Sequence, residues 1–209
     1  SLEVLNLINN PEFVAKYGFN QTTILTLFLP NTYQFNWATT AEEAIKRMAK
    51  EYKKFWTAER KTKAKKLNLS QSEVAILASI VQAEQTVHAD ERPKVAGLYI
   101  NRLRIGMLLQ SDPTLVYGLG DFTIRRVLNK HKDVNSRYNT YKYKGLPPGP
   151  INLPNIKSLD AVLNYESHNY LYMCAKEDFT GYHNFAKNYN QHLIYASKYQ
   201  RELNKRRIY

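Results

Sequence analysis

The spacing of apolar and polar residues along the chain predicts a mostly helical protein. Residues 2–16, and residues 41–66 as one long helix, carry apolar side chains at every third or fourth position, which is typical of helices with one buried face. The segment LSQSEVAILASIVQAE is more strongly apolar and predicts a buried helix. This helix should begin near Ser70, because Ser70 and Glu73 have the spacing of a capping box.

The second half of the chain predicts shorter elements. A helix is expected from residue 92 to about residue 105, since Pro93 suits a first helical turn. Residues 106–154 are rich in Asp, Asn, Tyr, Gly and Pro, which predicts loops. A short helix at 158–164, a strand pair in YLYMCAK and YHNFAK, and a final helix rich in Tyr, Lys and Arg should follow. The predicted fold class is α+β, mostly helical with a small β-sheet or hairpin.

Composition narrows the class of protein. With 209 residues, 44% of them hydrophobic, the chain can bury one substantial core or two small ones. The net charge of +12 favours polyanionic partners such as nucleic acid, anionic lipid or an anionic cell wall. However, the basic runs at 60–66 and 198–207 are also typical of solvated helix faces. We expect no cofactor and no metal, because no Gly-rich phosphate loop or metal-like histidine spacing occurs and Cys174 is the single cysteine.

Glu84 is the strongest candidate for chemistry. It follows Ile80 by four residues and Val81 by three, so on a helix it continues an apolar face. Burial raises the pKa of a carboxyl, which lets a glutamate keep its proton near neutral pH and donate it to a glycosidic oxygen. The alternative is a glutamate at a helix end that reaches solvent.

Ordinary glycosidases use two carboxylates, and Asp112 and Glu91 are the candidates for the second. Asp112 precedes a proline and could instead start a turn. Glu91 lies at the expected start of a helix, where an interaction with the helix dipole explains it better. The spacing of residues alone leaves the second carboxylate open.

Four segments together resemble a known family. They are LASIVQAE, ERPKVAGLYINRLRIGMLLQSDPT, YNTYKYKGLPPGPI and YLYMCAKEDFTGYHNFAKN, in this order. The chain from about residue 29 to residue 199 resembles the endolytic murein transglycosylases, also called MltG-type or YceG-like lytic transglycosylases.

The resemblance implies an enzyme of the bacterial cell wall. It would be a lyase that cleaves the bond between N-acetylmuramic acid and N-acetylglucosamine within nascent glycan strands, without water, and leaves a 1,6-anhydro end. One glutamate can protonate the leaving oxygen and then deprotonate the attacking 6-hydroxyl. The resemblance also implies a single membrane anchor in the inner (cytoplasmic) membrane, which we expect this chain to lack, and a catalytic domain on the periplasmic or extracytoplasmic side.

The resemblance carries residue roles with it. The family's helix commonly has two acids two positions apart, and here the first is Gln82 and the second is Glu84. Glu84 is therefore the implied catalytic residue; if the first acid were the active one, the chain would be inactive. The implied substrate-binding residues are Gln110, Asp112, Thr114, Tyr138, Asn139, Thr140, Tyr141, Pro147 and His183.

The expected organisation follows from the same resemblance. Residues 1–40 would be the end of a small LysM-like module with its linker, and residues 41–209 the catalytic domain. The expected partners are peptidoglycan glycan strands and wall synthases. Two alternatives stay open: a peptidoglycan-binding protein without activity, suggested by Gln82, and a nucleic-acid-binding domain, suggested by the charge but supported by no motif.

Overall fold

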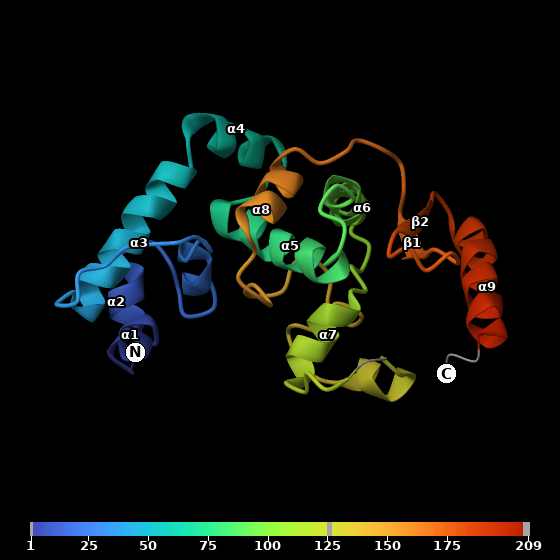
Figure 1. The fold of residues 1–209 in the computed structure, drawn as a ribbon, viewed down its shortest axis with the longest axis horizontal. Coiled ribbons are helices and arrows are strands. Elements are labelled where there is room, and N and C mark those ends of the chain that lie inside the picture. The colour runs from blue at the N-terminus through green and yellow to red at the C-terminus, as the bar shows by residue number, and fades with distance from the viewer. Residues whose placement is uncertain (1, 125–126, 207–209) are drawn as a thin grey trace.

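Helices account for most of the regular structure in the computed structural model, which describes residues 2–124 and 127–206 (Figure 1). The α-helices are α1 (Leu2–Ile8), α2 (Pro11–Ala15), α3 (Ala41–Phe55), α4 (Ala58–Lys66), α5 (Gln71–Glu84), α6 (Arg92–Arg104), α7 (Asp112–Leu119), α8 (Ile156–Leu163) and α9 (Tyr189–Lys205). Short 3-10 turns are η1 (Ile24–Leu27) and η2 (Asn129–Asp133). Strands β1 (Tyr172–Ala175) and β2 (His183–Ala186) pair antiparallel, which confirms the α+β class with a small hairpin.

Helix α5 is the centre of the molecule. It begins at the predicted capping box, where the Ser70 hydroxyl accepts from the Glu73 amide at 3.2 Å and the Glu73 carboxylate accepts from the Ser70 amide at 2.8 Å. Every residue from Val74 to Val81 is buried, and α6, α7 and α8 pack around the helix (Figure 1). The predicted buried helix is thus confirmed, and its last residue is Glu84.

The long helix predicted for residues 41–66 was wrong, because two helices meet there. Helix α3 ends at Phe55, and the Thr57 hydroxyl accepts from the Arg60 amide at 3.3 Å to cap the start of α4. Trp56, between them, is only 2% exposed. A capping threonine and a buried aromatic residue therefore outweigh the continuous helical pattern.

The loop predicted for residues 106–154 was wrong in part, since α7 lies within it. Ser111 is the residue before the helix, Pro113 lies in its first turn, and Gly120 ends it in the left-handed conformation at φ 71°. Asp112 therefore starts a helix and not an isolated turn. Proline is well tolerated in a first turn because no intrahelical partner is lost there.

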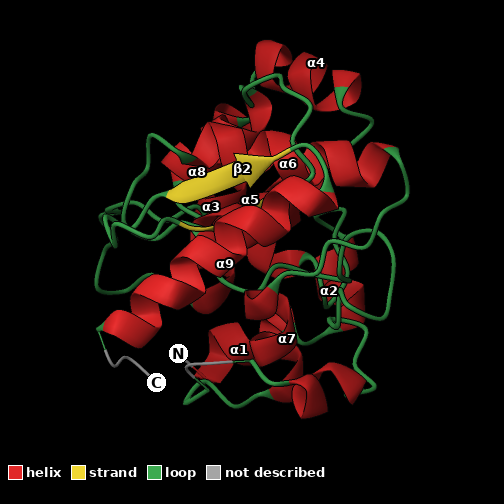
Figure 2. Ribbon diagram, turned by 90° about the vertical axis from the view of Figure 1, so that its right-hand side faces the viewer, coloured by secondary structure: helices red, strands yellow, loops and turns green. Residues whose placement is uncertain are grey.

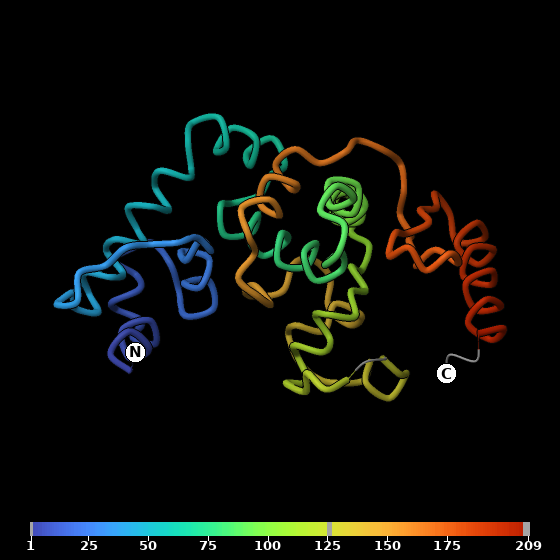
Figure 3. The backbone as a smooth tube through the Cα atoms, viewed as in Figure 1, coloured from blue at the N-terminus to red at the C-terminus, as the bar shows by residue number. Residues whose placement is uncertain are grey.

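The hairpin and α9 form the C-terminal end of the described chain. Figure 3 shows the segment after α8 passing α6 to reach the hairpin, and Asn101 of α6 donates to the carbonyls of His168 and Tyr170 in that segment at 2.7 and 3.1 Å. Figure 2 shows α9 lying alongside β2. The hairpin register pairs Tyr172 with Ala186, and this register fixes the positions of Tyr172 and the next residue, Met173, along β1.

The N-terminal segment packs onto the same core as the rest of the chain. Phe13, Val14, Ile24 and Leu27 are buried in one cluster with Ile45 of α3. Residues 2–40, all of them described, contain helices and turns and no strand. The LysM-like character of this segment and a domain boundary at residue 40 stay predictions. Within the described ranges, no helix is both long and apolar enough to cross a membrane.

Candidate active site

The Glu84 carboxylate at the end of α5 is held by two hydroxyl groups. Its Oε1 atom accepts from the Tyr99 hydroxyl at 2.7 Å and from the Ser111 hydroxyl at 2.5 Å. Burial raises the pKa of Glu84 above its ordinary value of 4.5; the two hydroxyl hydrogen bonds and His183 lower it, and Asp112 raises it further. Burial is the largest effect, so the carboxyl keeps its proton to higher pH than an exposed glutamate.

A cavity of about 330 Å³ has Glu84 in its wall. Residues far apart in the sequence form it, from α5, α6, the start of α7, the loop at residue 141, β1 and the start of α9. Four tyrosines line it: Tyr99, Tyr141, Tyr172 and Tyr189. Each ring offers an apolar face and a polar hydroxyl, a combination that suits the faces and hydroxyls of a sugar.

Three of the predicted substrate-binding residues line this cavity with Glu84. They are Gln110, Asp112 and Tyr141. The Tyr141 hydroxyl donates to the Asp112 carboxylate. Burial and this carboxylate raise the pKa of Tyr141, so its hydroxyl stays protonated and remains a donor. Gln110 has a left-handed backbone at φ 50°, and its amide donates to the carbonyl of Thr140 at 3.1 Å.

Three further predicted residues are buried behind the wall. The Thr140 hydroxyl accepts from the Ser111 amide at 3.0 Å and hydrogen-bonds the Thr114 hydroxyl at 2.8 Å. The side-chain amide of Asn139 donates to the carbonyls of two residues in the preceding loop, and its oxygen accepts from the Tyr141 amide at 3.0 Å. Thr114, Asn139 and Thr140 therefore hold Ser111 and Tyr141 in place and do not line the cavity.

Tyr138 and Pro147 lie elsewhere. The Tyr138 ring packs on Tyr117 of α7, with their centroids 4.7 Å apart. Pro147 lines a separate cavity of about 500 Å³ together with Ser70 and Arg104. The structure thus does not bring these two residues to the cavity of Glu84.

Gln82, the position at which the family resemblance implies the first of two acids, forms hydrogen bonds with residues at the start of α8. Its side-chain oxygen accepts from the Asn155 amide at 2.9 Å and from the Ser158 hydroxyl at 3.0 Å. It is not among the residues that line the cavity of Glu84. The Gln82 side chain therefore contacts the start of α8 and not the cavity of Glu84.

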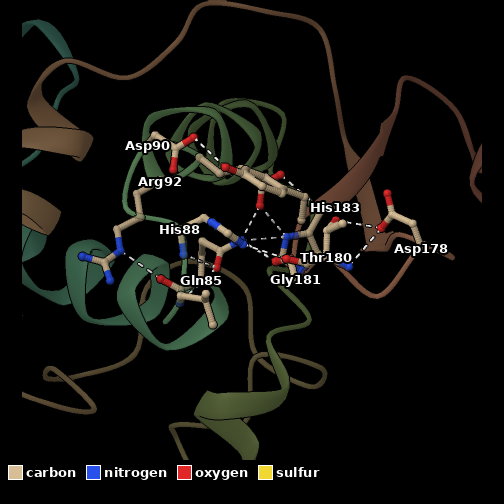
Figure 4. Close-up of polar contacts among 11 residues, drawn as sticks. Gln85, His88, Asp90, Arg92, Asp178, Thr180, Gly181 and His183 are labelled. Atoms are coloured by element: carbon tan, nitrogen blue, oxygen red, sulfur yellow. Dashed lines mark hydrogen bonds and ion pairs between the residues drawn. The ribbon is translucent and has the colours of Figure 1, made fainter.

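A second carboxylate, the buried Glu91, joins the end of α5 to the hairpin. Its two oxygens accept from the His183 amide at 2.9 Å and from the Gln85 side-chain amide at 2.5 Å, and His183 Nδ1 lies 2.7 Å away. Gln85 also donates to the Gly181 carbonyl at 3.0 Å. Figure 4 shows Gln85 and His183 pointing toward each other. His183, predicted to contact substrate, is thus paired with Glu91.

The surroundings of Glu91 act on its pKa in two directions. Burial raises it, but the hydrogen bonds from the His183 ring and amide and from Gln85 together outweigh burial and lower it below 4.5. The side chain makes no capping hydrogen bond to α6, so its contacts lie with the hairpin. Glu91 is therefore an ionised carboxylate that holds His183 of the hairpin, seven positions along the chain from Glu84, the candidate acid.

Sequence reasoning missed several residues of the cavity, and it missed Ser111, which donates to Glu84. Tyr99 and Arg102 are three residues apart on the predicted helix, a spacing that puts two polar groups on one face, and Ser111 stands between two residues that were predicted. His192, on α9, carried no local signal. Among the described residues, no three His, Cys, Asp or Glu side chains are grouped to hold a metal ion.

Comparison with known proteins places the chain in a family. The sequence profile of the YceG-like family matches residues 3–198. The chain belongs to the YceG-like family. A Bacillus subtilis (strain 168) protein named endolytic murein transglycosylase is 37% identical over 193 residues, which are 90% of this chain and 52% of that protein. A Streptococcus pneumoniae protein of the same name is 30% identical over 150 residues, 70% of this chain and 27% of that protein.

The fold is shared with a solved member of the family. The crystal structure of a YceG-like protein from Listeria monocytogenes has a TM-score of 0.77 and 31% sequence identity to this chain, covering 92% of this chain and 66% of that one. The chain spans about half the length of its Bacillus subtilis relative and about a quarter of the length of the streptococcal one. The family resemblance inferred from the four sequence segments is confirmed.

Proposed function

We propose that this chain is the catalytic part of a lytic transglycosylase that cleaves the N-acetylmuramic acid to N-acetylglucosamine bond within peptidoglycan strands. The observation that carries the proposal is a glutamate with a raised pKa in the wall of a tyrosine-lined cavity. The names of the relatives, endolytic murein transglycosylase, support the same reaction class. A carboxyl that keeps its proton near neutral pH is the group that a glycosidic oxygen needs as it leaves.

The two hydroxyl donors suggest how Glu84 presents its proton. Tyr99 and Ser111 both donate to Oε1, and among the described residues Oε2 has no hydrogen-bond partner. The proton therefore sits on Oε2 and passes to the leaving O4 of the glucosaminyl residue as its bond to C1 breaks. The Glu84 carboxylate then takes the proton of the muramyl 6-hydroxyl while O6 bonds to C1. The net step moves one proton from O6 to O4 and consumes no water.

Neighbouring groups support both halves of this step. Asp112 raises the pKa of Glu84, which favours the acid form before the reaction. The hydroxyls of Tyr99 and Ser111 stabilise the carboxylate that forms when the proton leaves. We assign substrate binding to Gln110, Asp112 and Tyr141 among the predicted residues because they share the cavity.

Digestion of purified glycan strands tests the proposal. The parent chain and Glu84→Gln are incubated with strands, and mass spectrometry counts 1,6-anhydromuramyl ends and ordinary reducing ends. We expect anhydro ends from the parent and none from Glu84→Gln. Gln82→Glu is the matched control two residues away, and it should retain the product because residue 82 faces α8.

Three outcomes would contradict the proposal in different ways. Equal product from parent and Glu84→Gln would remove Glu84 from the reaction. Ordinary reducing ends from the parent would mean hydrolysis by water. Strand binding with no product from the parent, and product from Gln82→Glu, would mean that the chain is a peptidoglycan-binding protein whose active acid is missing.

The setting of the reaction is a further part of the proposal. The full-length protein would act at the outer face of the bacterial cytoplasmic membrane, held by one membrane helix and close to wall synthases. The net charge of +12 supports work beside anionic lipid and wall polymers. Fractionation of the full-length protein tests the location, and its recovery with the soluble fraction would refute it.

A further inference from the structure

The proposed reaction poses a problem of selectivity, and the inference below rests on that proposed function. The two sugars that alternate along a glycan strand differ by one group, the lactyl ether on O3 of the muramyl residue. Both sugars have a 6-hydroxyl and a linkage at C1. An enzyme that cuts one of the two linkages must therefore recognise the lactyl arm, which ends in a carboxylate or, with a peptide attached, in an amide carbonyl.

Arg102 is the cation in the wall of the cavity that contains Glu84. The residue is only 7% exposed, and its Nε and Nη1 atoms donate to the carbonyls of Leu171 and Leu109, both at 2.6 Å. Among residues 2–124 and 127–206, no carboxylate lies within ion-pair distance of it and no acceptor bonds its Nη2 atom. Burying a cation without a paired anion costs free energy. The guanidinium is held in place by its other hydrogen bonds, so its Nη2 atom can donate to an oxygen of a ligand.

His192 lies in the same wall with an unused nitrogen. Its Nδ1 atom is buried and has no hydrogen-bond partner in the described part of the chain. The ring stacks near Tyr172 at 5.6 Å between centroids, and the Arg102 guanidinium lies 5.5 Å from the centre of the same Tyr172 ring. Burial, and then the charge of Arg102, lower the pKa of His192 below 6.5, so the ring is neutral at neutral pH.

These two side chains come from different elements and meet at one aromatic ring. A purely structural role for Arg102 would explain its bonds to the carbonyls but would leave both its Nη2 atom and His192 Nδ1 without partners. His192 Nδ1 is a buried atom without a partner in the described part of the chain, and such atoms are rare in proteins unless water or a ligand completes them. A ligand in this cavity would offer oxygen atoms to both groups.

We infer that Arg102 and His192 bind an oxygen of the 3-O-lactyl arm and so place the muramyl residue, and not the glucosaminyl residue, against Glu84. The arm occupies the part of the cavity between α6 and α9. Its anchoring sets which C1–O4 bond meets the acid. Arg102 is thus a specificity-determining residue, with His192 as its partner.

Binding to an inactive chain tests this without relying on turnover. All variants carry Glu84→Gln, and calorimetry measures their affinity for three tetrasaccharides: one with free lactyl carboxylates, one with peptide-bearing lactyl arms, and chitotetraose, which has no lactyl group. We expect Arg102→Gln to weaken binding of a lactyl-bearing ligand by about tenfold to a hundredfold, the effect of losing a charged hydrogen bond. Binding of chitotetraose should not change.

Arg104→Gln is the matched control. It removes the same charge from the same helix, but Arg104 is exposed and lies in the separate cavity with Pro147. A larger effect of Arg102→Gln on the free carboxylate identifies an anion as the ligand, and a larger effect on the peptide-bearing form identifies the amide carbonyl. Equal loss for chitotetraose, or unchanged preference for lactyl-bearing ligands in folded Arg102→Gln, would overturn the inference.

His192→Phe provides a second test if Arg102→Gln does not fold. His192 lies on α9, which has no buried residue, and phenylalanine keeps the contact with Tyr172. We expect it to lower the preference for lactyl-bearing ligands several-fold with an unchanged melting temperature. An unchanged preference would overturn the role of His192. Because these measurements use an inactive chain, they can fail while digestion by the parent still yields anhydro ends, and the reverse also holds.

Discussion

Glu91 offers the sharpest test of how the candidate site is held together. Replacing it with alanine leaves two donors without an acceptor, the His183 amide and the His183 ring nitrogen, and it removes one of the two acceptors of the Gln85 side-chain amide. Because Glu91 is 7% exposed, water cannot easily replace the carboxylate. Breaking a buried, hydrogen-bonded pair by removing one partner costs roughly 3–5 kcal/mol.

Thermal unfolding at neutral pH measures this cost. For a chain of this size each kcal/mol lowers the melting temperature by about 2–4 °C, so Glu91→Ala should lower it by about 6–20 °C. Glu166→Ala is the control, since the Glu166 side chain is 53% exposed and lies 4.0 Å from Lys94. An exposed pair of this kind contributes at most about 1 kcal/mol.

The pH dependence separates a role of the charge from a role of packing. The pKa of Glu91 is lower in the folded chain than its ordinary 4.5, so between those two values the unfolded chain binds more protons and stability rises with pH. The stabilisation by Glu91 is therefore present above pH 4.5 and is lost as the pH falls through the folded pKa. The gap in melting temperature between parent and Glu91→Ala should narrow below pH 4.5. A gap that stays constant down to pH 3, or a change below 2 °C at pH 7, would refute this reasoning.

Three further outcomes follow from the geometry. Glu84→Gln should melt at a higher temperature than the parent at pH 7, because the raised pKa of Glu84 means that its ionisation destabilises the folded chain as the pH rises. This difference should disappear toward pH 4, and a lower melting temperature of Glu84→Gln at pH 7 would contradict the reasoning. Ser111→Ala removes a bond that lowers the pKa of Glu84, so the alkaline limb of the rate profile should move to higher pH, and a shift to lower pH would contradict the assignment. Gly97→Ala would place a methyl group 2.3 Å from the Glu166 carbonyl and 2.7 Å from His168 Nε2. The substitution should lower the free energy of unfolding, measured in urea, by roughly 1–3 kcal/mol. An unchanged midpoint would mean that the segment with Glu166 and His168 can move aside.

Much of the fold could be predicted because its signals are local. The capping box at Ser70, the apolar run after it and the alternating strands of the hairpin each depend on residues close in sequence. The break at Thr57 was missed because a continuous helical pattern conceals a capping threonine. Helix α7 was missed because its residues resemble turn formers, although Pro113 also fits a first helical turn.

The candidate site could be predicted only in part, because its contacts are long-range. The apolar face of the helix and the family resemblance pointed to Glu84 as a candidate, whereas the donors that orient it come from residues 15 and 27 positions away. Residues close in sequence were assigned one role although the structure divides them: Tyr141 lines the cavity while Asn139 holds the loop behind it. His192 belongs to the cavity only because α9 packs against the hairpin, and no local pattern reports such packing.

The half-buried Glu84 and the buried Glu91 show how the surroundings of a carboxylate decide its role. Glu84 accepts two hydroxyl hydrogen bonds on a single oxygen, and burial outweighs them, so its pKa rises. Glu91 accepts from an amide, an imidazole and a carboxamide across both oxygens, and these outweigh burial, so its pKa falls. Groups whose pKa values are pushed apart can act as proton donor and as fixed charge in one site. Gln85 directly follows Glu84 in the chain and donates a hydrogen bond to Glu91. The ionised Glu91 therefore fixes the end of α5, the position from which the protonated Glu84 would act.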